Sequence, residues 1–330
     1  MSDHQMMRGH DDGGYNFAVG EAFFLADNLY WTNTIQLGSG PYYYPLAAGD
    51  KMLIEEIQLL HPGKHIVITN GCKQALSAAM YAFKDVYDYF TAHHDAPYWP
   101  SYPTLIKGAR LLTEERGSRD DYTTLRLSTL INNPNGSLAI EECDLLDCAY
   151  GHSVYGWNGS MPAHKVSVWS AAKLFGLAGL RLGWLVTDDS ALAASAAFYS
   201  EITTSGASVL SQHYIAKVLK FQRENPEIVK NTYNDARKTL LYNADLFCVS
   251  LGAYCSVIQG VPLNGCGMFA WFQIAPEYQE RFADAIAKLK IKFVTGEACG
   301  IKEKGWYRMS MGHRVDFTAE ALEKLRMAIK

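Results

Sequence analysis

The sequence lacks the long apolar runs and the strong excess of one charge that mark several large classes of protein. No apolar run approaches the ~18 residues of a membrane-spanning helix, and the polar start over residues 1–14 has no apolar signal core. With 30 Lys and Arg against 34 Asp and Glu, the net charge of −4 makes nucleic acid a less expected partner, although a local basic patch is not excluded. We therefore expect a soluble, cytoplasmic protein without a membrane contact.

The usual signatures of metal and nucleotide sites are also missing. The seven cysteines are an odd number and lie singly, with no pair at zinc-like spacing, so reduced thiols are the simplest interpretation. His93-His94 lies in a polar stretch and is interpreted as surface or packing residues. Neither GxxxxGK[ST] nor GxGxxG occurs, so the sequence predicts no metal and no nucleotide loop.

The chain instead alternates short β-rich runs with helical patterns. Apolar residues make up 48% and charged residues 19%, which is typical of a globular protein with a sizeable core. We expect strands at 65–69, 124–131, 145–147, 165–169 and 182–187, with a helix over 74–83. This alternation predicts an α/β fold with a mostly parallel sheet covered on both faces.

The C-terminal third predicts a smaller α+β domain. Asn225-Pro226-Glu227 has the composition of a helix start, with an N-cap, a proline at the first position and an acid in the first turn. Strands are then expected at 268–272, 291–295 and 306–311, with helices over 278–289 and near Thr318.

Two segments carry the polar residues expected at a site. Asn70 to Gln74 links a strand to a helix, where glycine and free amides can hold a phosphate, although an ordinary turn has the same composition. In the segment 170–184, Ser170 precedes Lys173 by three positions, and Arg181 follows among glycines. A lysine between a buried strand and an apolar turn can act as an amine nucleophile. The second segment therefore predicts a Schiff-base lysine beside a phosphate site.

These residues bring out a resemblance to the fold-type I enzymes that use pyridoxal 5′-phosphate (PLP), in the aspartate aminotransferase superfamily. The segment 170–184 resembles their S-x-x-K-x-x-G-x-x-G-x-R-x-G signature, 133–136 their N-P-x-G turn, 147–150 their D-x-A-Y motif, and Arg308 their carboxylate-binding arginine. Only 13 residues separate Asn133 from Asp147, so the helix usual between these motifs is expected to be missing. This compact spacing is similar to the alliinase and tryptophan aminotransferase branch.

The resemblance implies a fold and a division into domains. It implies a large PLP-binding α/β domain over residues 35–224, with a mostly parallel sheet of the seven-stranded type between helices. Residues 1–34 together with 225–330 would form the small α+β domain. The sequence departs from the branch at Cys72-Lys73-Gln74, where small hydroxyl residues are usual.

The resemblance also implies roles around the PLP ring. Lys173 would form the aldimine and shuttle a proton at the substrate Cα, and Asp147 would pair with the pyridine nitrogen. Asn133 and Tyr150 would bind the ring oxygen. Trp99 would stack on the ring, with Tyr102 as the alternative.

The remaining roles concern the phosphate, the substrate and a second subunit. Ser170, Arg181 and the backbone of Gly71, Cys72 and Lys73 would hold the phosphate. The substrate would be bound by Arg308 at its carboxylate, by Asn133, and by an N-terminal segment around Gly20. One of Tyr42, Tyr43 and Tyr44, for which we take Tyr44, would reach the partner's phosphate, so a homodimer with a shared active site is expected.

The reaction is the least determined feature. Transamination of an L-amino acid is favoured, because the most similar branch includes aminotransferases and Arg308 is retained. Decarboxylation of an amino acid, or of an amino-acid group on a larger carrier such as a hypermodified nucleobase of phage DNA, is the first alternative. An alliinase-like β-elimination with cleavage of a C–S bond is the second.

Overall fold

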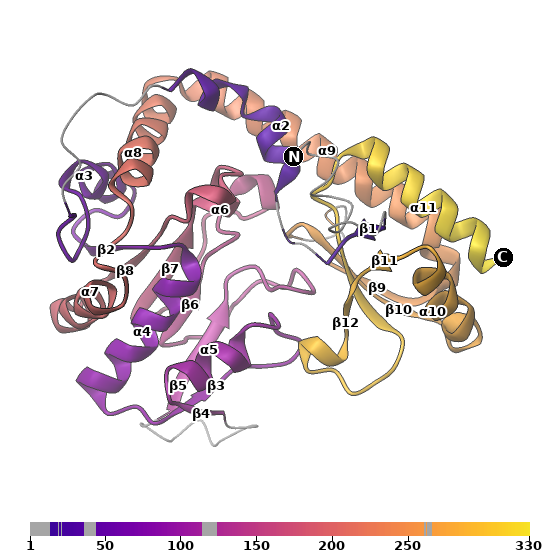
Figure 1. Ribbon diagram of the computed structural model, residues 1–330, viewed down its shortest axis with the longest axis horizontal. Helices are drawn as coiled ribbons and strands as arrows, with labels where there is room; N and C mark the ends of the chain where they lie inside the picture. Colours follow the sequence, from indigo (N-terminus) through magenta and orange to yellow (C-terminus); the bar gives the residue numbers. More distant parts are fainter. Residues whose placement is uncertain are drawn as a thin grey trace.

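A seven-stranded sheet forms the centre of the larger lobe of the computed structural model, which describes residues 14–18, 20, 22–35, 44–113, 124–260, 262 and 266–330 (Figure 1). From edge to edge its strands are β2 (His65–Thr69), β8 (Gly183–Thr187), β7 (Val166–Ser170), β6 (Leu145–Asp147), β5 (Thr124–Thr129), β3 (Thr91–His93) and β4 (Leu112–Thr113). Only β8 is antiparallel to its neighbours. The predicted α/β fold with a mostly parallel sheet is confirmed.

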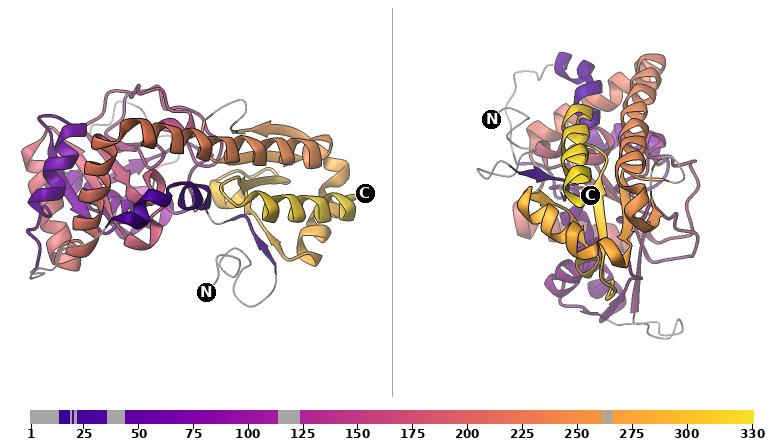
Figure 2. Two further views of the ribbon diagram at one scale, coloured as in Figure 1. Left: turned by 90° about the horizontal axis from the view of Figure 1, so that it is seen from above. Right: turned by 90° about the vertical axis from the view of Figure 1, so that its right-hand side faces the viewer.

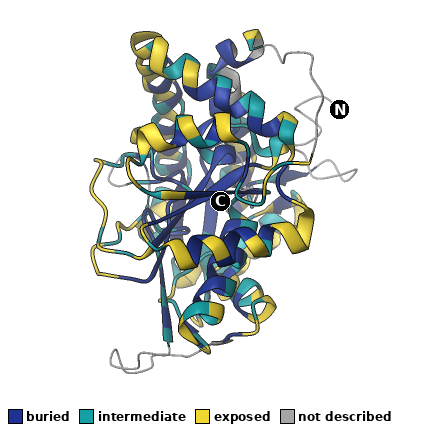
Figure 3. Cartoon of the chain, turned by 90° about the vertical axis from the view of Figure 1, so that its left-hand side faces the viewer, coloured by how far each residue is buried: buried dark blue, intermediate teal, exposed yellow. Residues whose placement is uncertain are grey.

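Helices cover both faces of this sheet, because successive strand side chains point to opposite sides. Val67 of β2 packs with α4 (Cys72–Tyr87), α5 (Tyr102–Gly108) and α7 (Ser190–Thr204). Ile66 and Ile68 pack in the core that contains α3 (Lys51–Leu60) and α8 (Val209–Glu224). Figure 3 shows the result, with buried strands between helices whose outer faces are exposed. A short helix, α6 (Ala171–Leu174), follows β7 directly.

The segment between β5 and β6 runs without a helix, as the short spacing of the two motifs predicts. Residues 130–144 form turns and a single bridge from Ile131 to Leu138. β5 therefore ends at Thr129, two residues before the predicted end. The turn after β5 carries Asn133 directly to the edge of the sheet.

The smaller lobe contains an antiparallel sheet packed on long helices (Figure 1). Its strands, in order, are β12 (Val294–Thr295), β13 (Trp306–Ser310), β10 (Phe269–Ile274) and β9 (Cys255–Gln259). The helices are α9 (Pro226–Leu251), α10 (Gln279–Lys288) and α11 (Val315–Ile329). Figure 2 shows that α9 extends along both lobes.

The N-terminal segment joins this smaller lobe although it is far away in the sequence. β1 (Tyr15–Asn16) pairs in parallel with β11 (Ile291–Lys292), and α2 (Phe23–Asn28) packs on α9. The backbone N–H of Ser310 donates to the carbonyl of Phe17 at 3.1 Å. Residues 14–18 therefore lie against β11 and the end of β13 in the smaller lobe.

Two predictions about the small lobe are wrong in detail. The predicted strand over 291–295 is two short strands, because β11 pairs with β1 while β12 pairs with β13. α9 begins at Pro226 as predicted, but the side chain of Asn225 does not cap it. Its Nδ2 donates instead to the carbonyl of Phe221 at 3.0 Å, at the end of the preceding helix.

Among the described residues, no helix combines the length and the apolar character needed to cross a membrane. The same part of the chain contains no group of three His, Cys, Asp or Glu side chains placed to hold a metal ion. The ring of His94 packs 4.3 Å from that of Tyr98, centroid to centroid.

Candidate active site

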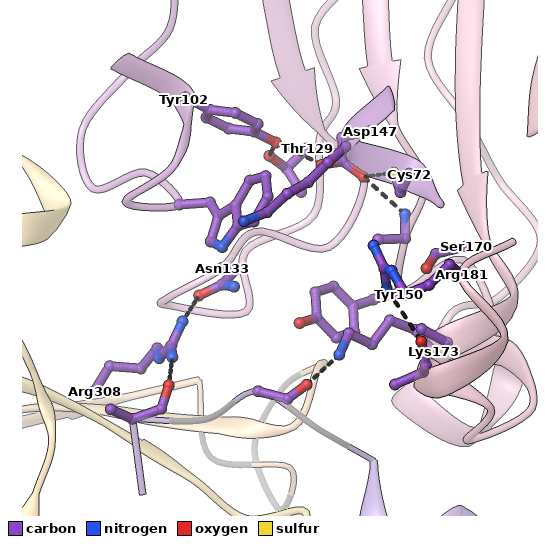
Figure 4. A pocket seen from close by; sticks show the side chains of 17 residues that line it. Cys72, Tyr102, Thr129, Asn133, Asp147, Tyr150, Ser170, Lys173, Arg181 and Arg308 are labelled. Carbon is purple, nitrogen blue, oxygen red and sulfur yellow. Dashed lines mark hydrogen bonds between the residues drawn. The ribbon is translucent and has the colours of Figure 1, made fainter. Parts of the chain in front are cut away.

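The carboxyl ends of β5, β6 and β7 surround a cavity of about 390 Å³ (Figure 4). In parallel α/β sheets this edge is where loops and helix starts place ligand-binding groups. The start of α4, the turn after β5, the N-terminal segment and β13 complete the walls. The lining residues are Ala18, Gly20, Cys72, Lys73, Trp99, Tyr102, Thr129, Asn133, Asp147, Ala149, Tyr150, Ser170, Ala172, Lys173, Ala178, Arg181 and Arg308.

Lys173 enters the cavity from α6, immediately after β7. Its Nζ donates a hydrogen bond to the carbonyl of Gly20 in the N-terminal segment. Its own backbone carbonyl accepts from the hydroxyl of Tyr155 at 2.7 Å. Both ends of this lysine are therefore positioned, one by a buried tyrosine of the large lobe and one by a chain segment that pairs with the small lobe.

Asp147 is the one carboxylate among the described residues that line the cavity, and it is 4% exposed at the end of β6. Burial raises the pKa of this carboxyl, and three hydrogen-bond donors lower it: the N–H of Ala149, the hydroxyl of Tyr102 and the thiol of Cys72. The Ala149 and Tyr102 bonds are 2.9 Å long, and the Cys72 sulfur lies 3.7 Å from Oδ1. The donors therefore offset part of the cost of burying a negative charge, and the pKa stays above its ordinary value.

Arg308 enters from β13, opposite Asp147, and is 4% exposed. Its Nη1 donates to Asn133 Oδ1 and its Nη2 to the carbonyl of Ala18, each at 2.6 Å. The guanidinium lies 4.3 Å from the centroid of the Phe269 ring. Its Nε is buried and has no hydrogen-bond partner among the described residues, and burial lowers the pKa of the group. The guanidinium is therefore held in place by two hydrogen bonds, and its Nε–H remains available to a further acceptor.

Tyr150 lies beside Asn133 in the middle of the cavity. Burial raises the pKa of its phenol, while nearby Arg308 and a hydrogen bond with Asn133 lower it. Its ring contacts that of Phe269 edge-on at 5.7 Å between centroids. Asn133 and Tyr150 are thus brought together, as the resemblance implies.

A group of hydrogen-bond donors lies at the start of α4. Gly71 has φ of +81°, a backbone conformation that favours glycine, and a Cβ there would stand 2.7 Å from Nη2 at the end of the Arg181 side chain. The N–H of Gly71 donates to the carbonyl of Thr69, which leaves the amides of Cys72 and Lys73 as the free donors of the helix start. Ser170 lines the same wall.

The two aromatic candidates for ring stacking occupy different places. Trp99 lines the cavity, and the Lys73 ammonium lies 5.3 Å from its ring centroid. Tyr102 is 2% exposed and stands perpendicular to Trp99, and its hydroxyl donates to Asp147. The geometry therefore favours Trp99 and gives Tyr102 a different part.

Tyr44 is the predicted site residue that lies apart from the cavity. It is 88% exposed and lines a separate hollow with Asn70 and residues 204–210. Tyr42 and Tyr43, like Val19 and Glu21 beside Gly20, lie outside the described residues.

Sequence reasoning missed three groups that the fold brings to the site: Thr129, the carbonyl of Ala18 and the hydroxyl of Tyr155. Thr129 ends β5 directly opposite Asp147 in the parallel pairing of β5 and β6, so strand alignment was the signal for it. Ala18 and Tyr155 act through long-range hydrogen bonds that no local pattern reveals.

The arrangement combines groups suited to an aldehyde cofactor with a phosphate and a pyridine ring. An amine and a buried carboxylate line the same cavity, and two cationic groups, Arg181 and Arg308, lie on different walls. The donors around Gly71 and the unpartnered Nε of Arg308 are both features that anionic groups would satisfy.

Comparison with known proteins agrees with this geometry. Residues 144–325 match the family described as aminotransferase class I and II. Tryptophan aminotransferase-related protein 2 of Arabidopsis thaliana is 31% identical over 177 residues, 48% of this chain and 39% of that protein. Tryptophan aminotransferase-related protein 1 of Oryza sativa subsp. japonica is 30% identical over 170 residues, 48% of this chain and 38% of that protein. The chain matches less than half the length of these relatives.

Solved structures of aminotransferases share the fold over nearly the whole chain. Aspartate aminotransferase from Thermotoga maritima superposes with a TM-score of 0.71 at 18% identity, covering 98% of this chain and 93% of that one. Aromatic aminotransferase from Pyrococcus horikoshii OT3 gives 0.72 at 17% identity, with 95% of each chain covered. Together with the family match, this confirms the fold-type I resemblance, and the curated relatives it matches are tryptophan aminotransferase-related proteins. The chain belongs to the aminotransferase class I and II family.

Proposed function

We propose that the chain is a PLP-dependent aminotransferase that acts on the α-amino group of an L-amino acid. One observation carries the proposal: Lys173, Asp147 and Arg308 come from α6, β6 and β13 and converge on a single cavity. Family membership supports the same class of cofactor and reaction.

The residues present fit PLP, which when bound supplies a ring that withdraws electrons from the substrate Cα. Asp147 would hold a proton on the ring nitrogen, since it is a buried carboxylate with one side open to the cavity. Asn133 and Tyr150 would donate to the ring oxygen, and Trp99 would pack on the ring face. The amides of Cys72 and Lys73, with Ser170 and Arg181, would bind the phosphate.

Two further groups would act on the amino acid. Lys173 would bind the aldehyde carbon and later take and return the Cα proton, for which its amine must be uncharged. Arg308 would bind the α-carboxylate as a planar fork, replacing its present bond to the Ala18 carbonyl. The carbonyl of Gly20, which accepts from Lys173, would be displaced in the same way.

The cofactor assignment is tested with the purified chain. We expect it to bind PLP with a visible absorption band, and borohydride reduction followed by peptide mapping should place the cofactor on Lys173. A Lys173→Ala variant should lose the reducible adduct, whereas Lys107→Ala, an exposed lysine on α5, should keep it. A reducible adduct in Lys173→Ala would contradict the proposal.

The reaction is tested by offering a panel of L-amino acids. A 2-oxo acid together with pyridoxamine phosphate is the expected product pair. Carbon dioxide without a 2-oxo acid would instead indicate decarboxylation, and pyruvate with ammonia would indicate β-elimination. If no free amino acid reacts, the same panel on carrier-bound amino acids tests the alternative of a larger substrate.

We further propose a homodimer and the division into a large domain over 35–224 and a small domain over 1–34 with 225–330. The hollow is lined by the exposed side chains of Tyr44 and Leu210, and Leu46 and Ile202, which are close in sequence to lining residues, are exposed as well; exposed apolar side chains of this kind suit a subunit contact. Sedimentation of the protein should give twice the chain mass. Tyr44→Ala should weaken PLP binding only if this tyrosine reaches the second active site.

A further inference from the structure

The strongest feature that the proposed function does not use is a chain of buried hydroxyl groups behind Asp147. Thr129 Oγ1 lies 2.6 Å from the Tyr102 hydroxyl oxygen, which lies 2.9 Å from Asp147 Oδ2 (Figure 4). Thr129 is 8% exposed, Tyr102 2% and Asp147 4%. Three polar groups are thus joined by hydrogen bonds and largely buried.

The direction of these hydrogen bonds follows from the number of protons. An ionised carboxylate only accepts, so the single hydroxyl proton of Tyr102 points to Asp147. Tyr102 has no second proton for Thr129, and Thr129 must therefore donate to Tyr102. Burial and the neighbouring Asp147 raise the pKa of Tyr102 well above its usual value, so the phenol remains a donor at every physiological pH.

Rigid backbone elements hold all three groups. Thr129 and Asp147 are paired residues at the ends of β5 and β6, and Tyr102 is the first residue of α5. The other oxygen of Asp147, Oδ1, accepts the N–H of Ala149 and faces the thiol of Cys72. Oδ2 receives one donor among the described residues, which leaves an acceptor position on it for a ring nitrogen.

We propose that Thr129 and Tyr102 are positioning residues that orient Asp147 and sustain its negative charge, so that it can hold the proton of a pyridine-type ring. The inference rests on the proposed function for the identity of the ring. It assigns to Tyr102 a part distinct from stacking, which belongs to Trp99. Neither residue contacts the reacting atoms in this arrangement.

The first test measures PLP binding as a function of pH by quenching of tryptophan fluorescence. Tyr102→Phe removes one donor to the carboxylate, so we expect PLP affinity to fall about tenfold. Because the hydrogen bond lowers the pKa of Asp147, its loss should move the acid limb of the binding curve to higher pH. Thr129→Val should cause a smaller change in the same direction, and Thr129→Ser should restore the wild-type curve.

Two controls separate the effect of the Thr129–Tyr102–Asp147 hydrogen bonds, here called the relay, from an effect of side-chain packing. An analogue of PLP with carbon in place of the ring nitrogen should bind equally well to the wild type and to Tyr102→Phe. Tyr214→Phe also removes a tyrosine hydroxyl. This hydroxyl does not line the cavity, and it donates to the Thr32 carbonyl at 2.6 Å. This variant should leave PLP binding and its pH dependence unchanged.

The second test needs no cofactor. Carbon-13 labelling of aspartate, with Asp147→Asn to assign the signal, gives the pKa of Asp147 in the free chain, which should be higher in Tyr102→Phe than in the wild type. An unchanged pKa would overturn the relay, as would an equal loss of affinity for PLP and its carbon analogue. A wild-type chain that binds no PLP but shows the expected pKa difference would overturn the proposed function and leave the relay standing.

Discussion

The two ends of the cavity are built in different ways. The Asp147 end belongs to one lobe, where strand ends and the starts of two helices provide hydroxyl, thiol and amide donors in fixed positions. The Arg308 end is assembled from β13, the turn at Asn133 and the N-terminal segment, and one of its two bonds goes to the backbone carbonyl of Ala18. The first end is preorganised for a resident group, whereas the second holds its arginine with a contact that a carboxylate can replace. This contrast suits a cofactor that stays and a substrate that exchanges.

The most damaging change at the fixed end is Asp147→Asn. It keeps the shape but removes a buried charge, and the loss of one partner from a buried pair costs about 3–5 kcal/mol. We expect the rate constant of the amino-acid half-reaction to fall by about three orders of magnitude. Stopped-flow spectroscopy with the best substrate of the panel measures this. A decrease of less than tenfold would show that Asp147 is not the partner of the ring.

At the exchangeable end, Arg308→Lys should act on substrate rather than on cofactor. A lysine keeps the charge but loses the planar fork, which costs about 2–3 kcal/mol for a bidentate carboxylate bond. We expect kcat/KM to fall about 100-fold, with most of the change in KM and with an unaltered dissociation constant for PLP. A large loss of PLP affinity would show that the two ends are not separate.

Gly136 connects the two ends, because it lies in the turn that presents Asn133. It has φ of +69°, and a Cβ there would stand 2.2 Å from the backbone carbonyl oxygen of Cys266, next to β10. Gly136→Ala should therefore lower the free energy of unfolding by about 2–3 kcal/mol, measured by urea denaturation. Gly159 is the matched control: its φ is +93° and a Cβ would meet nothing within 4 Å, so Gly159→Ala carries the backbone strain alone.

The two ends also differ in how far the sequence predicts them. Local patterns located β2, β6, β7 and β8 to within a residue, and with them Asp147, Ser170 and Lys173, because each lies at the end of an apolar strand or just after one. The contacts of Arg308 with Ala18 and Asn133 span 290 and 175 residues, and no local pattern carries such pairings. The short strand β1 and the division of 291–295 between two sheets were unpredictable for the same reason.

Acid should affect the exchangeable end through His313, which follows β13 and is fully buried. Its ring packs against Phe17 and Phe317, and neither ring nitrogen has a hydrogen-bond partner in the part of the chain that the structure describes; burial lowers its pKa to about 3. The unfolded chain binds this proton below about pH 6.5, and the folded chain resists it until about pH 3, so stability falls as the pH falls through this window.

Between about pH 6.5 and pH 5 this one group should cost up to about 2 kcal/mol of the free energy of unfolding, at about 1.36 kcal/mol per pH unit. His313→Leu should flatten the acid limb by that amount in urea denaturation, whereas His65→Leu, an exposed histidine at the start of β2, should not. Because the Phe17 carbonyl is hydrogen-bonded to Ser310 of β13, the loss of stability should begin in the N-terminal segment. Hydrogen exchange at pH 5 should therefore be faster over residues 14–18 than over β6. Equally faster exchange in residues 14–18 and in β6 would mean that acid unfolds the whole chain in one step, so that the two ends of the cavity do not differ in local stability.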